Sequence, residues 1–251
     1  MTALAAILAL VVGLTLGLLG GGGSILTVPV IAFTLGVDPK TAIVMSLPIV
    51  GGASLIGIAR HWKLGNIDFR IAIPFGAAAM VGAFGGARLA RFMEGSTQLI
   101  LLAVVMLGAS FSMFRNANLS EPELPSTPRK IGPLTFIVGA LTGTLTGLVG
   151  VGGGFLLVPA LVLLAKVPMR QAVGTSLFVI VLNTIAGFAG YAGSVAVPWV
   201  LVFWFAGFTA VGILGGSALA AKVSQSNLKR AFAVLLVLVA AYILWQSRST
   251  F

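Results

Sequence analysis

Apolar residues dominate the chain in long blocks, and short polar stretches separate the blocks. Six blocks contain about 17 to 25 residues each, the length that crosses a hydrocarbon layer roughly 30 Å thick as an α-helix. These blocks cover about 41–60, 71–92, 97–114, 171–191, 197–221 and 229–247. The alternating ten-residue pattern of a membrane β-barrel is absent. The pattern therefore predicts an all-α polytopic membrane protein.

Two further apolar runs, 3–36 and 131–165, are longer, and glycines interrupt each of them. Aligning the chain with itself so that Gly17 meets Gly147 lays GLLGGGGSILTVPVI (17–31) on GLVGVGGGFLLVPAL (147–161). The same alignment pairs two further stretches, AIVMSL (42–47) with AVGTSL (172–177) and GAFGGARLA (82–90) with GILGGSALA (212–220). The chain is therefore an internal duplication, and we call this pairing the repeat alignment.

The longest polar stretch, RNANLSEPELPSTPRK at 115–130, contains three prolines and charges of both signs. Such composition is typical of a linker rather than of a helix. We therefore divide the chain into an N-terminal membrane repeat (1–114), a cytoplasmic linker (115–130) and a C-terminal membrane repeat (131–251). Each repeat holds one Gly-interrupted first helix followed by three transmembrane helices.

The basic residues decide how the two repeats are oriented. If each interrupted run crosses the membrane once, the fifteen Lys and Arg residues divide seven against eight, which violates the positive-inside rule. If each run turns back at its glycines, eleven Lys and Arg residues lie on one side of the membrane and four on the other. The second arrangement predicts two inverted repeats with both termini outside and the linker in the cytoplasm. It leaves open whether each interrupted run is re-entrant or forms two short full spans.

Composition supports the membrane assignment and narrows the chemistry. The 251 residues are 59% hydrophobic and 8% charged, and the mean hydropathy is +1.13. The net charge of +10 comes from residues at segment ends, so we attribute it to helix anchoring rather than to nucleic-acid binding. The N-terminus, MTALAAILALVVG, lacks the basic region of a signal peptide and is interpreted as part of the first helix.

Few residues are available for catalysis or metal binding. The chain has no cysteine, one histidine and five acidic residues, and every acidic residue falls in a predicted loop or helix end. We therefore expect no enzymatic activity, no metal site and no cofactor. The histidine, His61, is expected as an interfacial side chain in a cytoplasmic cluster with Arg60, Lys63 and Arg70.

The interrupting glycines suit a sharp turn at membrane depth, because glycine adopts positive φ and allows close backbone approach. New helices are expected to start at Ser24 and Gly154, and Pro29 and Pro159 should loosen them. A helix that starts inside the membrane presents unpaired N–H groups and the positive end of its dipole, which favours an anion. Inverted repeats bring both turns together near the midplane, so the sequence predicts one shared anion site.

Small and polar residues around the two turns complete the predicted substrate-binding set. Its members are Gly20, Gly22, Gly23, Ser24, Ser46, Gly150, Gly152, Gly153, Gly154, Thr175, Ser176 and Asn183. Alternatives stay open for several of them. A buried serine often donates back to its own helix, an asparagine can bond between helices, and glycine pairs such as Gly13/Gly17 and Gly143/Gly147 favour helix packing.

The doubled motif, GLLGGGGSILTVP and GLVGVGGGFLLVP, together with AIVMSL and AVGTSL, resembles the sulfite exporter TauE/SafE family of membrane transporters. The resemblance covers both halves, about 10–247, and implies transport of sulfite, small organosulfonates or other sulfur-containing anions. The two motifs differ at Gly21, which faces Val151 in the alignment, and at Ser24, which faces Gly154. These differences make the two half-sites unequal.

We therefore expect a secondary transporter, with export as the expected direction, that works by alternating access in a plasma or bacterial inner membrane. Its partners would be the small anion and the lipid bilayer, with no nucleic acid, and a homo-oligomer is left open. The alternatives are a passive anion channel of the same fold and a non-catalytic subunit of a membrane complex. No acidic side chain is predicted deep in the membrane, so the anion would move down its own gradient, carry its own proton, or couple through backbone and hydroxyl oxygens.

Overall fold

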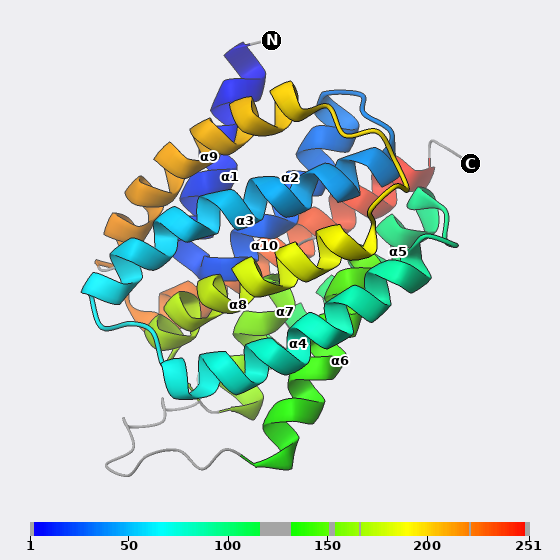
Figure 1. Cartoon of the computed structure of the whole chain (residues 1–251). Helices are drawn as coiled ribbons and strands as arrows, with labels where there is room; N and C mark the ends of the chain where they lie inside the picture. The colour runs from blue at the N-terminus through cyan, green and yellow to red at the C-terminus, as the bar shows by residue number, and fades with distance from the viewer. Residues whose placement is uncertain (1–2, 116–131, 151–153, 166, 221, 249–251) are drawn as a thin grey trace.

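The computed structural model describes residues 3–115, 132–150, 154–165, 167–220 and 222–248 (Figure 1). These residues form helices and connecting loops, with no strand among them. The first half contains α1 (Ala3–Leu19), a 3₁₀ helix (Gly20–Leu26), α2 (Thr27–Pro29), a π-helix (Val30–Thr34), α3 (Pro39–Lys63), α4 (Phe69–Ala90) and α5 (Gly95–Arg115). The second half contains α6 (Pro133–Val149), α7 (Gly154–Pro159), a π-helix (Ala160–Leu164), α8 (Met169–Gly190), α9 (Trp199–Ala220) and α10 (Gln225–Arg248).

Among the described residues, six helices are long and apolar enough to cross a membrane, and they correspond to the six predicted blocks. Shorter apolar helices cover Ala3–Leu19, Ser24–Thr34, Pro133–Val149 and Gly154–Leu164. Large apolar side chains also face outward, with Phe92 91% and Val200 81% exposed. Exposure on this scale fits a surface that lipid covers. The predicted fold class, an all-α polytopic membrane protein, is confirmed.

The duplication seen in the sequence recurs in the helix boundaries. The repeat alignment lays the first and last residues of α1 on those of α6, and the first and last residues of α4 on those of α9. Both π-helices also occupy matched positions, and each directly follows the proline of its motif, Pro29 or Pro159. Proline has no N–H group and its ring clashes with the carbonyl one turn back, so a wider turn relieves the helix there. The predicted loosening by both prolines is confirmed.

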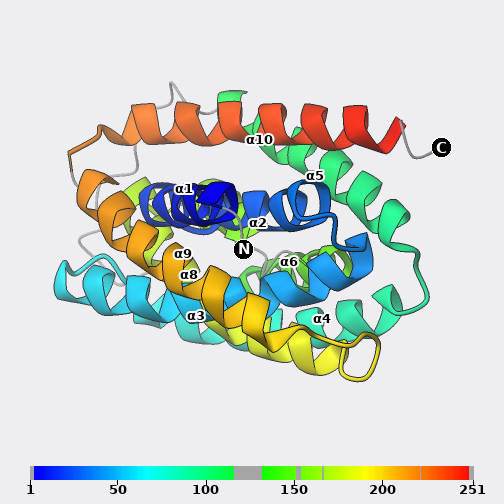
Figure 2. The same ribbon diagram turned by 90° about the horizontal axis from the view of Figure 1, so that it is seen from above.

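Each half packs its helices mainly on the other half. α1 lies on α9, α4 on α6 and α8, α5 on α10, and α3 on α8 and α9. Figure 2 shows α1, α2 and α6 between α10 on one side and α3 and α4 on the other. The residues after the glycine turns are therefore at the centre, where Ile25, Val28, Phe155 and Val158 are fully buried. Because most of the large contacts cross between halves, neither half has a complete core of its own.

Glycines bring the crossing helices into backbone contact, and the contacts exchange between the halves. A Cβ built on Gly13 would lie 2.0 Å from the Thr209 carbonyl oxygen, and one on Gly143 would lie 2.1 Å from that of Ala79. The repeat alignment matches Thr209 to Ala79, so each contact is the other with the halves exchanged. Such exchange is the property of a two-fold relation. The packing interpretation of Gly13 and Gly143 is confirmed.

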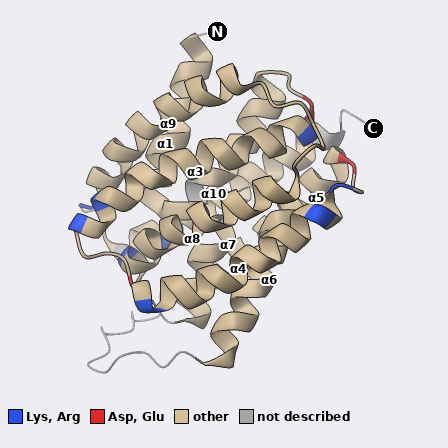
Figure 3. Ribbon diagram, viewed as in Figure 1, with Lys and Arg blue, Asp and Glu red and all other residues tan. Residues whose placement is uncertain are grey.

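Matched helices run in opposite directions. In Figure 1, α3 runs from right to left and α8 runs from left to right. Lys and Arg residues gather at the two ends of this bundle and leave its middle without charge (Figure 3). At one end the Arg170 guanidinium donates to the Val223 carbonyl at 3.3 Å, and at the other Lys40 Nζ donates to the Arg91 carbonyl at 2.8 Å. Charges at both ends and none between them suit helices that cross a membrane.

Candidate functional site

Each glycine motif begins with a left-handed residue. Gly20 has φ +65° directly after α1, and Gly150 has φ +72° directly after α6. A side chain costs free energy in this conformation, so glycine is the residue that ends both helices there. Gly20 packs against the backbone of Val173, and Gly150 packs against the side chain of Ile43, the residue matched to Val173. The predicted turns are therefore present and related by the same two-fold exchange.

The two glycine turns touch each other at the centre of the molecule. A Cβ on Gly21 would lie 2.0 Å from Gly154 Cα, and a Cβ on Gly154 would lie 2.1 Å from Gly21 Cα. Gly21 and Gly154 also lie at two of the positions where the motifs differ, because their matched partners are Val151 and Ser24. The differences thus supply the glycine pair that lets the turns meet. An anion bound between the turns requires them to separate from this conformation.

Ser46 and Ser176 link each half to the turn of the other half. Ser46 Oγ donates to the carbonyls of Ile43 at 2.8 Å and Gly150 at 2.6 Å. Ser176 Oγ donates to the Val173 carbonyl at 2.8 Å and accepts from the Gly21 N–H at 3.3 Å. Back-bonding to the serine's own helix is therefore confirmed, and each hydroxyl also fixes the opposite turn.

The second helix of each motif starts differently in the two halves. α7 begins at Gly154 as predicted, but residues 20–26 form a 3₁₀ helix and α-helical bonding resumes at Thr27. Ser24 Oγ donates to the Gly21 carbonyl at 2.6 Å, and no capping bond from a helix N–H to a side chain is found in this motif. A helix does cover Ser24–Thr34, as predicted, but its first residues, through Leu26, belong to the tighter 3₁₀ helix, where the Ser24 hydroxyl back-bonds. In the first motif, neither the 3₁₀ helix nor α2 has a side-chain cap.

The remaining predicted site residues divide into three groups. Gly22 and Gly23 lie within the 3₁₀ helix, whereas Gly152 and Gly153 lie outside the described residues. Thr175 Oγ1 accepts from the Asp68 N–H at 3.0 Å, which ties it to the loop before α4. Asn183 is 2% exposed, and neither atom of its amide has a hydrogen-bond partner among the described residues. It lies about two turns from Ser176 on the same face of α8.

Sequence reasoning misplaced His61. The side chain is 2% exposed, and in the described part of the chain its only polar contact is one with the Gly17 backbone that falls short of normal hydrogen-bond geometry. The interfacial position expected for it is therefore wrong, because the end of α3 is covered by α8 and α9. Thr27 and Ser54 also bury hydroxyl oxygens that find no partner among the described residues. Buried polar groups are nearly always hydrogen-bonded, so these positions fit contacts to a ligand or an ion.

Comparison with known proteins agrees with the duplicated motif. The family model for "Sulfite exporter TauE/SafE" matches residues 5–243, nearly the whole chain. The chain belongs to the TauE/SafE family. A probable membrane transporter protein of Xylella fastidiosa (strain 9a5c) is 34% identical over 94% of this chain and 92% of its own length. Another from Methanocaldococcus jannaschii is 29% identical over 87% of this chain and 86% of its own.

A third relative, the probable membrane transporter protein YdhB of Bacillus subtilis, is 28% identical over 76% of this chain and 78% of its own length. No solved structure matches the chain. The family and its relatives identify this protein as a multi-pass membrane transporter.

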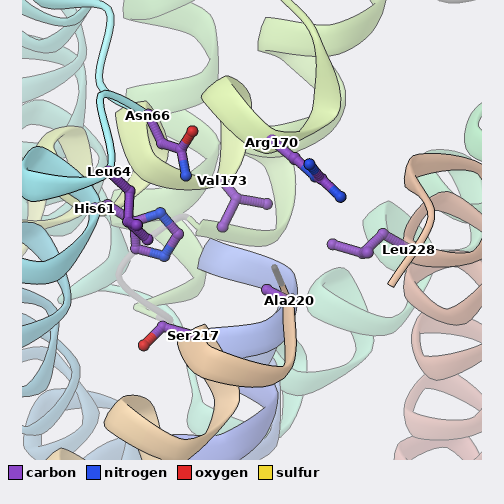
Figure 4. Close-up of a pocket in the computed structure, with 8 residues that line it drawn as sticks. All are labelled: His61, Leu64, Asn66, Arg170, Val173, Ser217, Ala220 and Leu228. Atoms are coloured by element: carbon purple, nitrogen blue, oxygen red, sulfur yellow. The ribbon is translucent and has the colours of Figure 1, made fainter. Parts of the chain in front are cut away.

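In this TauE/SafE protein the two ends of the bundle differ at matched positions. At one end, His61 lines a pocket with Arg170 and Leu228 (Figure 4). At the other end, Tyr191 and Gln98 take the places of His61 and Leu228. The Tyr191 hydroxyl donates to the Gly147 carbonyl at 3.0 Å and accepts from Gln98 Nε2 at 2.8 Å.

Gln98 Nε2 also donates to the Leu148 carbonyl at 2.7 Å, so the Tyr191–Gln98 pair closes over the end of α6. Burial raises the pKa of Tyr191, and the bond from Gln98 offsets only part of that rise, so the hydroxyl remains a neutral donor. The matched position at the other end has no such pair. We call the end bridged by the Tyr191–Gln98 pair the closed end, and the end with His61, which has no such bridge, the open end.

Proposed function

We propose that this transporter carries sulfite or a small organosulfonate out of the cell by alternating access around the two glycine turns. The observation that carries the proposal is the arrangement just described: two glycine turns related by a two-fold exchange meet at the centre, and the two ends beyond them differ in whether a Tyr–Gln pair bridges them. A carrier that alternates needs two such ends with matched geometry, only one of which is open at a time.

The anion would bind when the turns separate. Backbone N–H groups of 22–26 and 154–156 would then point at it, and Ser46 and Ser176 stand beside them. Donors of this kind, together with the helix dipole, stabilise an anion without a buried cation. The positions of the acidic residues also favour an anion, because no Asp or Glu lies in the middle of a described helix. We infer that the anion supplies the only charge at membrane depth.

Orientation follows from the charges at the two ends. The open end gathers the C-terminal ends of α3 and α9 and the N-terminal ends of α4 and α8, which carry Arg60, Lys63, Arg70, Arg170 and Lys222. The closed end carries Lys40, Arg88 and Arg91. The positive-inside rule assigns the open end to the cytoplasm and both termini to the outside.

The test is sulfite flux in proteoliposomes that contain the purified protein. Sulfate, thiosulfate, small sulfonates and chloride are added in turn as competitors, with and without an imposed pH gradient. Saturable flux that sulfonates inhibit and chloride does not inhibit supports the proposal. Flux that rises linearly with concentration favours a channel of the same fold, and absence of flux for every anion contradicts the proposal.

A further inference from the structure

The open end contains a pocket that the glycine-turn site does not include. It lies where α3, α8 and α9 end or begin, next to the start of α10. Its lining is formed by His61, Leu64, Asn66, Arg170, Val173, Ser217, Ala220 and Leu228.

His61 is the polar group that most needs a partner in this pocket. Figure 4 shows its ring among Asn66, Val173 and Ala220, with Arg170 across the cavity. The ring is almost wholly buried, and its one backbone contact, with Gly17, falls short of normal hydrogen-bond geometry, so neither nitrogen is well paired in the described residues. A neutral imidazole offers one donor and one acceptor, and leaving both unmade inside a protein costs free energy. A ligand in the pocket would satisfy them.

The lining of the pocket also has the positive charge and the polar side chains that binding of an anion requires. Arg170 lines the pocket and supplies a positive charge, and its guanidinium has five N–H donors, one of which donates to the Val223 carbonyl at 3.3 Å. Ser217 Oγ donates to the Leu214 carbonyl at 3.0 Å and keeps its acceptor lone pairs, while Asn66 carries both donor and acceptor atoms. No Asp or Glu is among the described residues that line the pocket. Anions are therefore favoured over cations.

Two residues connect the pocket to the first glycine turn. Val173 lines the pocket, and its Cα would lie 2.9 Å from a Cβ on Gly20. Ser217 lines the pocket, and its backbone nitrogen would lie 2.7 Å from a Cβ on Gly17. Ser217 thus stands between the pocket and the end of α1, and Val173 stands between the pocket and the turn that follows α1.

At the closed end, the residues matched to His61 and Arg170 form hydrogen bonds within the protein. There the larger Tyr191 replaces His61, and its hydroxyl is satisfied by Gln98 and two backbone carbonyls. Lys40 replaces Arg170, and its ammonium donates to the carbonyls of Arg91 and Met93. The closed end satisfies these polar groups within the protein. At the open end the His61 ring has only its weak contact with the Gly17 backbone, so it keeps hydrogen-bonding capacity for a ligand.

We propose that the His61 pocket is a loading site for a protonated, monoanionic oxyanion such as hydrogen sulfite. The ring nitrogen that accepts would take a hydrogen bond from the protonated oxygen of the anion, the ring N–H would donate to another of its oxygens, and Arg170 would balance its charge. A fully ionised oxyanion such as sulfate has acceptors only, so it leaves one ring nitrogen unsatisfied. The inference deepens the proposed function and rests on it for the identity of the anion.

The experiment measures binding apart from transport. Purified protein is heated with increasing sulfite, near neutral pH where hydrogen sulfite is abundant, and with sulfate, and each apparent dissociation constant is taken from the shift in melting temperature. We expect His61→Phe and Arg170→Gln to weaken sulfite binding about tenfold or more, because each removes a hydrogen bond to a charged ligand. His61→Gln keeps a donor and an acceptor and should restore part of the affinity.

Lys63→Gln is the matched control, because Lys63 is a cation at the same end that does not line the pocket. Its sulfite affinity should equal that of the unmodified protein. Equal sulfite affinity in the unmodified protein, His61→Phe and Arg170→Gln would overturn the loading site, as would sulfate binding as tight as sulfite. If these binding results hold but proteoliposomes show no flux, the proposed transport fails and the site stands as an anion-binding site.

Discussion

Replacing Gly21 by alanine tests whether the two glycine turns must touch. The added Cβ would start 2.0 Å from Gly154 Cα, and the backbones must part until that distance reaches the 3.4 Å at which ordinary contact begins. Atoms of the backbone cannot rotate away as a side chain can. Gly21 also has no positive φ, so the contact alone is perturbed. Overpacking of this kind costs about 1 to 3 kcal/mol, and the backbone contact places this case toward the upper limit.

The assay pairs thermal unfolding with sulfite flux. A chain of this size loses about 2 to 4 °C of melting temperature per kcal/mol, so Gly21→Ala should lower it by roughly 5 to 12 °C. Flux should fall as well, because the turns can no longer close. Gly52→Ala is the control, since nothing lies within 4 Å of a Cβ at Gly52. If Gly21→Ala keeps the melting temperature and flux of the control, the turns do not need their contact.

Three further changes probe the packing, the closed end and the topology. Gly86→Ala should lower the melting temperature, because the added Cβ would lie 2.2 Å from the Thr144 carbonyl oxygen. The neighbouring change Gly85→Ala, where the Cβ meets open space, should leave the melting temperature equal or higher. An equal loss in both variants would refute the packing role of Gly86. Tyr191→Phe should lower the free energy of unfolding by about 1 kcal/mol, because hydrogen bonds of the hydroxyl are lost. Tyr242→Phe, at a side chain that is 41% exposed, should cost little. Equal effects would refute the role of the Tyr191 hydrogen bonds in bridging the closed end. Single cysteines at Glu94 and Asn227, both exposed, should label from opposite sides of the membrane in this cysteine-free chain, and labelling from one side would exclude inverted repeats.

The fold was predictable because membrane burial leaves a strong signal in the sequence. Six spans, the duplication and both left-handed glycines follow from block length, the repeat alignment and the chemistry of glycine. The contact between Gly21 and Gly154 did not follow. The sequence shows that the motifs differ at these positions, but only the folded chain shows that the two differences face each other.

Side-chain positions at helix ends were harder to predict than the helices. His61 stands between Arg60 and Lys63 in the sequence, and this neighbourhood suggests an exposed cluster. Its burial depends on how α8 and α9 cover the end of α3, which is a tertiary property. The available signal was the repeat alignment, which places His61 opposite Tyr191 and marks a difference between the two ends.

The most direct test of the account is sulfite exchange in proteoliposomes loaded with labelled sulfite. Unlabelled sulfite is added outside, and the rate of label release is compared with release into buffer that contains chloride. Alternating access predicts faster release in the presence of external sulfite, because a loaded carrier returns more readily than an empty one. Release that external sulfite leaves unchanged or slows would contradict a carrier built around the paired glycine turns.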